Sequence, residues 1–107
     1  MTPLINQPIY PGTEYADHLG FTSDKFLGYL WDLNDGAIWI SFIISKQPGK
    51  GHFSQFLERL LLIGKTVKVP TPFPGMEQIL IHKEFTHTIE IFEFLQIDVW
   101  VKHVPHT

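Results

Sequence analysis

Residues 37–69 read AIWISFIISKQPGKGHFSQFLERLLLIGKTVKV, and this stretch decides the fold. Ala37–Ser45 is almost wholly apolar and rich in β-branched and aromatic residues, which predicts a central β-strand covered on both faces. From Phe53 the apolar residues recur at i, i+3, i+4, i+7 and i+8, the spacing of an amphipathic helix, and Gly64 is suited to end it. Thr66–Val69 predicts a second, short strand. This order of elements predicts a right-handed parallel crossover.

The residues before this stretch predict a hairpin. Phe26–Trp31 is rich in β-forming side chains, and Asn34-Asp35-Gly36 is a strong turn signal. We expect this strand to pair antiparallel with Ala37–Ser45. Residues 1–25 are rich in Pro, Gly, Thr and Asn and show no sustained period, so we expect an irregular N-terminal segment with one short strand near Leu4–Tyr10.

The residues after the stretch predict a helix and a closing hairpin. Gly75–Phe85 has helical spacing, and the prolines before it end the preceding strand. Thr88–Phe94 and Ile97–Lys102 alternate as strands do, with a turn expected at Leu95–Gln96. Residues 1–107 are therefore expected to form a single α/β domain, a mixed sheet with helices on its faces.

Composition argues against several classes of protein. The 107 residues include no cysteine, which excludes disulfide frameworks, thiolate nucleophiles and Cys-ligated zinc. A net charge of −3 argues against an electrostatic nucleic-acid binder. No apolar run reaches the ~18 residues of a membrane span and no secretory signal is visible, so we expect a cytoplasmic protein with no membrane partner. The six histidines lack the spacing of a metal site, and no metal is predicted.

The turn Gly49-Lys50-Gly51, between the apolar strand and the helix, is the segment best suited to bind a ligand. The first turn of a helix leaves backbone N–H groups without partners and carries the positive end of the helix dipole. Glycines allow an anion to approach closely, and Lys50 adds a positive charge. The spacing matches neither the Walker A loop nor the dinucleotide fingerprint, so it indicates a phosphate without saying which one. The alternative is a plain connection that uses glycine for a tight turn.

The order of elements carries a resemblance to a known family. A strand, a Gly-x-Gly-type turn, an amphipathic helix, a strand, a second helix ending in an aromatic residue and a terminal hairpin follow one another in Phe26–Val104. This region resembles the GNAT superfamily of N-acetyltransferases, and the string GKGHFSQFL…VKVPTPFPGMEQIL is most similar to its small phage-type members. The resemblance implies a GNAT-like fold without part of the usual N-terminal region. It also implies direct transfer of an acetyl group from acetyl-CoA to an amine of a small molecule or protein.

The resemblance further implies where coenzyme A would bind. In the family, the amides of the turn hold the pyrophosphate, and the edge of the preceding strand pairs with the pantetheine arm. On this sequence the strand-edge residues are Phe42, Ile43, Ile44 and Ser45, and the residues of the turn and helix start are Gln47, Gly49, Lys50, Gly51, His52, Phe53 and Ser54. Asp32, Glu90, Glu93 and the histidines are conceivable bases, but no motif selects one. The catalytic residues are therefore left unassigned.

The chain also departs from the family pattern. Pro48 stands where the family has Arg or Gln, Phe53 replaces a small residue, and Glu84 replaces a glycine. Leu80 stands where a tyrosine acid is frequent, and leucine cannot protonate a leaving thiolate. Two alternatives stay open: an inactive acetyltransferase-like fold that binds coenzyme A or another protein, and an α/β domain with no ligand at the Gly turn. Because the region before Phe26 is short, we expect part of the sheet to be uncovered and available to a second copy in a homodimer.

Overall fold

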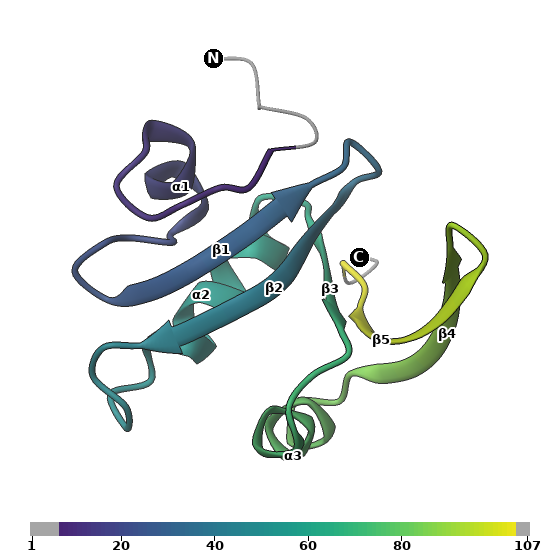
Figure 1. Ribbon diagram of the computed structural model, residues 1–107. Coiled ribbons are helices and arrows are strands. Elements are labelled where there is room, and N and C mark those ends of the chain that lie inside the picture. Colours follow the sequence, from purple (N-terminus) through teal and green to yellow (C-terminus); the bar gives the residue numbers. More distant parts are fainter. Residues whose placement is uncertain (1–6, 105–107) are drawn as a thin grey trace.

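A mixed sheet with the strand order β1-β2-β3-β5-β4 organises the protein (Figure 1). The computed structural model describes residues 7–104. Strands β2 and β3 are parallel, and the other neighbouring strands are antiparallel. The predicted α/β class and mixed sheet are therefore confirmed. The elements are α1 (Glu14–Leu19), β1 (Phe26–Asp32), β2 (Ala37–Ser45), α2 (His52–Leu62), β3 (Thr66–Pro70), α3 (Pro74–His82), β4 (Thr86–Phe92) and β5 (Leu95–Lys102).

The first hairpin and the strand–helix–strand unit are confirmed. In the β1–β2 turn Asn34 and Gly36 take positive φ values of 59° and 81°, a conformation that Asn and Gly adopt readily. Helix α2 ends as predicted before Gly64, which has a φ of 84°. The N–H of Gly64 donates to the carbonyl of Leu61 at 3.1 Å, which satisfies one of the last carbonyls of the helix.

A bulge divides β2 into two halves. Tyr29 lies opposite Phe42, whereas the next residue, Leu30, lies opposite Ile40, so Ser41 is an extra residue in β2. A bulge of this kind bends the strand that carries it and increases its local twist. The two halves of β2 therefore follow different directions.

Strands β2 and β3 separate at this bend. They pair only where Ala37–Trp39 lies beside Thr66–Lys68. Residues 37–40 of β2 are buried, whereas residues 41–45 are exposed or partly exposed. The prediction of a strand covered on both faces is therefore correct for the first half of β2 and wrong for the second, because β3 turns away toward α3 (Figure 1).

The three helices pack on one face of the sheet. The opposite face has a separate cluster, made of the buried strand residues Ala37, Trp39, Val99 and Val101. We expected helices on the faces of the sheet. Within the described residues, the helices bury side chains against one face only. The main hydrophobic cluster includes Ala16 and Leu19 of α1, Phe56, Leu57 and Leu60 of α2, Leu80 of α3, and Ile38, Ile40, Val67 and Val69 of the sheet.

Helix α1 lies in the segment that the sequence predicted to be irregular, and that prediction is wrong for Glu14–Leu19. The hydroxyl of Thr13 caps the helix by accepting from the N–H of Ala16 at 3.2 Å, and Gly20 ends it with a φ of 88°. Ala16 and Leu19 are fully buried. A helix of six residues is too short to show a repeating apolar pattern, so tertiary packing stabilises it rather than propensity.

Within residues 7–10, the short strand predicted near Leu4–Tyr10 is present as one bridge. The N–H of Ile9 donates to the carbonyl of Leu30 at 2.7 Å, and the N–H of Leu30 donates back at 3.0 Å. Residues 4–6 of that prediction lie outside the described residues. Ile9 is buried, and its bridge to Leu30 adds one residue pair to the sheet beyond β1.

The C-terminal elements differ from prediction in their boundaries. Helix α3 ends at His82 rather than at Phe85. The closing turn is Glu93-Phe94, with φ values of 47° and 71°, rather than Leu95–Gln96. A two-residue turn with positive φ at both positions normally carries Asn-Gly, so Glu-Phe gives no recognisable signal in the sequence.

Candidate functional site

Two glycines shape the connection between β2 and α2. Gly49 and Gly51 have φ values of 84° and 77°, and a Cβ added at either would meet no atom within 4 Å. Gly51 caps α2, and no side chain bonds to the helix start. The N–H of Gln55 donates to the carbonyl of Gly51 at 3.0 Å, so the N–H groups of residues 52–54 have no partner inside the helix. Main-chain donors therefore lie beside open space, as an anion site requires.

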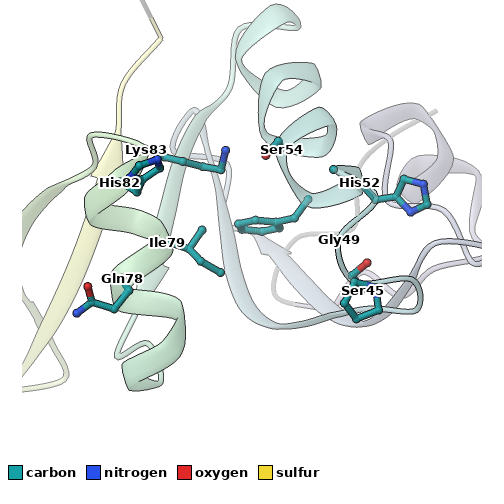
Figure 2. A pocket seen from close by; sticks show the side chains of 11 residues that line it. Ser45, Gly49, His52, Ser54, Gln78, Ile79, His82 and Lys83 are labelled. Atoms are coloured by element: carbon teal, nitrogen blue, oxygen red, sulfur yellow. The ribbon is translucent and has the colours of Figure 1, made fainter.

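The helix start forms one wall of a cavity of about 660 Å³, which we call the turn cavity. The opposite wall is formed by Gln78, Ile79 and His82 of α3 and by Lys83, the residue that caps its C-terminus. Figure 2 shows Ile79 pointing into the space between α3 and the start of α2, and Lys83 extending from α3 toward α2. A lysine thus lies across the cavity from the positive end of a helix dipole, and both features favour an anion.

The ring of His52 points away from α3 (Figure 2), although His52 belongs to the wall of the turn cavity. Its Nδ1 atom is buried and has no hydrogen-bond partner among the described residues. The imidazole is therefore not aimed at a ligand held between the two helices. What His52 offers such a ligand is its backbone N–H group.

A second cavity, of about 570 Å³, lies where β2 and β3 separate, and we call it the strand cavity. Residues 40–44 of β2 form one wall, and residues 69–73 with Met76 form the other. Within residues 7–104, no strand pairs with the edge of Ser41–Ser45 that faces β3. Backbone N–H and C=O groups on such an edge are available to an extended ligand. Ile44 lines the strand cavity and the next residue, Ser45, lines the turn cavity, so the end of β2 contributes to the walls of both cavities.

The structure brings most of the residues implied by the family resemblance to these two cavities. Gln47 and Lys50 are the exceptions, because both are exposed and line neither one. Pro48, where the family has Arg or Gln, lies in the wall of the turn cavity. The strand cavity holds Phe42, Ile43 and Ile44, and the turn cavity holds Ser45, Gly49, Gly51, His52, Phe53 and Ser54.

Sequence reasoning missed the walls opposite the predicted residues. Ile79 of α3 and its C-cap Lys83 line the turn cavity, and Tyr29 of β1 and Phe73 line the strand cavity. The one available signal was the i, i+4 spacing of Ile79 and Lys83, which places them on one face of a helix. That spacing does not say which element the face will meet, because the packing partner of α3 is set by tertiary structure.

The carboxylates considered from the sequence lie away from both cavities. Asp32 is buried and accepts a hydrogen bond from Tyr15, Glu90 pairs with a lysine of β3, and Glu93 lies in the β4–β5 turn. No Asp or Glu is among the described residues that line the two cavities. Leu80 is fully buried in the main core and lines neither cavity. No general base or acid of the carboxylate type is therefore present at this site.

Two further observations concern the described part of the chain as a whole. No group of three or more His, Cys, Asp or Glu residues there is arranged to hold a metal ion. No helix in residues 7–104 is both long enough and apolar enough to cross a membrane.

Comparisons with protein-family models, curated proteins and solved structures found no match.

Proposed function

We propose that this protein is a GNAT-like N-acetyltransferase, which binds acetyl-CoA and transfers its acetyl group to an amine. The observation that carries the proposal is at the end of β2, where a strand edge that pairs with no strand of residues 7–104 leads into a helix N-terminus without a side-chain cap. Each of these features lines one cavity, and β2 contributes to the walls of both. A ligand with a diphosphate at one end and an amide-containing chain at the other would match both. Coenzyme A has that composition.

The turn cavity would hold the diphosphate. The N–H groups of residues 52–54 supply hydrogen-bond donors, and the dipole of α2 favours negative charge at this position. Lys83 would supply a positive charge from the opposite wall. Lys50, exposed on the turn, adds to the positive potential outside the cavity.

The strand cavity would hold the pantetheine arm. The edge of Ser41–Ser45 would pair with its amides in the manner of an added strand. A main-chain N–H on the same edge would then polarise the thioester carbonyl. Apolar side chains in the walls, such as Ile44 and Phe73, would contact the methylene groups of the arm.

The reaction itself needs little from side chains. The amine nitrogen attacks the carbonyl carbon of the thioester, a C–N bond forms and the C–S bond breaks. The proton lost from the nitrogen ends on the sulfur of coenzyme A or on water. Holding the two reactants in contact supplies most of the acceleration, so the proposal requires no carboxylate in the cavities.

A second candidate function is binding of coenzyme A without catalysis. The observation in its favour is the position of Leu80, which occupies the core at the point where a tyrosine acid is frequent in the family. The lack of Asp and Glu among the described cavity residues also fits this function.

Thermal unfolding with and without acetyl-CoA tests both functions. Acetyl-CoA at a hundred times its dissociation constant is expected to stabilise the fold by about 2.7 kcal/mol, a midpoint rise of roughly 10 °C or more in a domain this small. Release of free thiol in the presence of amines then separates the two candidates. The chain contains no cysteine, so all thiol detected comes from coenzyme A. No midpoint shift at millimolar acetyl-CoA would contradict both functions.

The site is located by a pair of glycine variants. Gly51→Asp adds a carboxylate where the diphosphate is expected and should abolish the midpoint shift. Gly64→Asp is the matched control, because Gly64 follows the other end of α2, has a φ of 84° and also has open space around it. A shift that persists in Gly51→Asp would place the ligand elsewhere.

A further inference from the structure

A row of aromatic rings crosses the sheet surface beside the strand cavity. Tyr29 of β1 lies between Tyr10 and Phe42, with ring centroids 6.0 Å from the first and 6.3 Å from the second. Tyr10 is 53% exposed and Phe42 is 38% exposed. Tyr29 shares a face of β1 with Trp31, which packs against the cluster to which no helix within residues 7–104 contributes. The row therefore lies on the side of the sheet away from the helices.

This row connects the strand cavity with a third cavity. Tyr29 and Phe42 line the strand cavity, and both also line a cavity of about 490 Å³ that extends to Tyr10 and Lys46. An acyl group held along the edge of Ser41–Ser45 would lie beside Tyr29 and Phe42. The third cavity is then a route by which an acceptor could reach it past Tyr10 and Leu27.

The charges in these two cavities restrict the acceptor. Lys46 is the one charged side chain among the described residues that line them, and its ammonium group donates to the carbonyl of Ser23. A ligand with several ammonium groups would meet no carboxylate here and would be repelled by Lys46. The tilted rings of Tyr10, Tyr29 and Phe42 instead favour a planar ring, which gains contact in offset or tilted arrangements.

We infer that the acceptor is an aromatic monoamine, an inference that rests on the proposed transferase function. Its ring would pack on Tyr10, Tyr29 and Phe42, and its nitrogen would face the edge of β2. The positive charge of Lys46 in the wall of the third cavity disfavours the ammonium form and thus favours the free amine that must attack. The nitrogen lone pair forms the new C–N bond, the C–S bond breaks, and the nitrogen proton passes to the thiolate or to water.

Thiol release from acetyl-CoA by the full chain tests this inference with 2-phenylethylamine, n-butylamine and spermidine as acceptors. The expected kcat/KM for 2-phenylethylamine exceeds that of the other two by about tenfold, the discrimination that one good ring contact supports. Tyr29→Leu should remove most of this preference, whereas Tyr29→Phe should keep it. Phe94→Leu, a change of a fully exposed ring in the β4–β5 turn, should leave it unchanged.

Binding measured without acetyl-CoA makes the inference independent of catalysis. Aromatic NMR resonances of Tyr29 and Phe42 are expected to shift on titration with 2-phenylethylamine and not with spermidine. No shift at millimolar 2-phenylethylamine, or faster turnover of spermidine, would overturn the inference. Shifts at these rings without thiol release from any amine would instead overturn the transferase proposal and support the ring-binding site.

Discussion

The phenol of Tyr15 donates a hydrogen bond of 2.6 Å to a carboxylate oxygen of Asp32, and this contact ties α1 to the end of β1. Asp32 is only 3% exposed, and its other carboxylate oxygen accepts from the N–H of Asn34 at 2.9 Å. The ammonium group of Lys65 lies 3.9 Å away. A buried carboxylate needs such partners, because an unpaired charge in the interior is costly.

Tyr15→Phe is therefore expected to destabilise the protein by about 1–2 kcal/mol, since it removes a donor to a buried charged acceptor. Chemical denaturation at neutral pH measures the loss. Tyr10→Phe is the control, because Tyr10 is 53% exposed, and it should change stability by less than about 0.5 kcal/mol. Equal effects of the two changes would show that the Tyr15–Asp32 bond contributes nothing specific.

The same contact predicts a dependence on alkaline pH. Burial, with help from the hydrogen bond and the charge of Asp32, raises the pKa of Tyr15 above its ordinary value. The unfolded chain releases this proton near pH 10, about the ordinary pKa of tyrosine, while the folded protein keeps it. The contribution of Tyr15 is thus complete below about pH 10 and is lost as the pH rises further. The stability gap between wild type and Tyr15→Phe should narrow above that pH, and a constant gap would contradict the raised pKa.

Gly28→Ala is expected to cost at least about 3 kcal/mol or to prevent folding. A Cβ at this position would lie 2.0 Å from the carbonyl oxygen of Phe42, and the φ of Gly28 is 121°. Gly12→Ala separates the effect of a positive φ from that of the steric clash, because Gly12 has a φ of 96° and no atom within 4 Å of an added Cβ. It should lose only about 1 kcal/mol, the cost of backbone strain alone. Thermal unfolding compares the two, and similar losses would argue against the close approach of β1 to β2.

Lys83→Gln is expected to weaken acetyl-CoA binding more than Lys50→Gln does. Lys83 lines the turn cavity, whereas Lys50 is exposed and outside it, where salt screens its charge. Removal of Lys83 should raise the dissociation constant by roughly twofold to fivefold, the value of one partly screened charge contact. Calorimetric titration at two salt concentrations measures this. A larger rise of the dissociation constant in Lys50→Gln than in Lys83→Gln would mean that the diphosphate lies over the turn rather than between the helices.

Leu80→Ala is expected to destabilise the protein by about 2–5 kcal/mol, because it opens a cavity in the core. Leu80 is fully buried. Ile81→Ala, at a neighbouring residue of α3 that is 54% exposed, is the control and should cost much less. At a temperature where both variants are folded, neither should change the rate of thiol release. A lower rate of thiol release in Leu80→Ala, but not in Ile81→Ala, would indicate that Leu80 contributes to the active site.

Local sequence patterns predicted the elements wherever a repeat was long enough to recognise. The apolar run of Ala37–Ser45, the helical spacing from Phe53 and the cap at Gly64 all appear in the structure. The same reasoning failed for α1, which is too short to show a period, and for the Glu93-Phe94 turn, whose residues are unusual at positive φ.

The candidate site divides in the same way. The Gly49-Lys50-Gly51 turn and the strand before it were visible in the sequence, because glycine and apolar runs act through local backbone geometry. The cavities were not visible, since they depend on the bulge at Ser41, the separation of β2 from β3 and the position of α3. Those features are set by packing between residues far apart in the chain, so only the tertiary structure decided that Lys83 and Tyr29 would face the predicted residues.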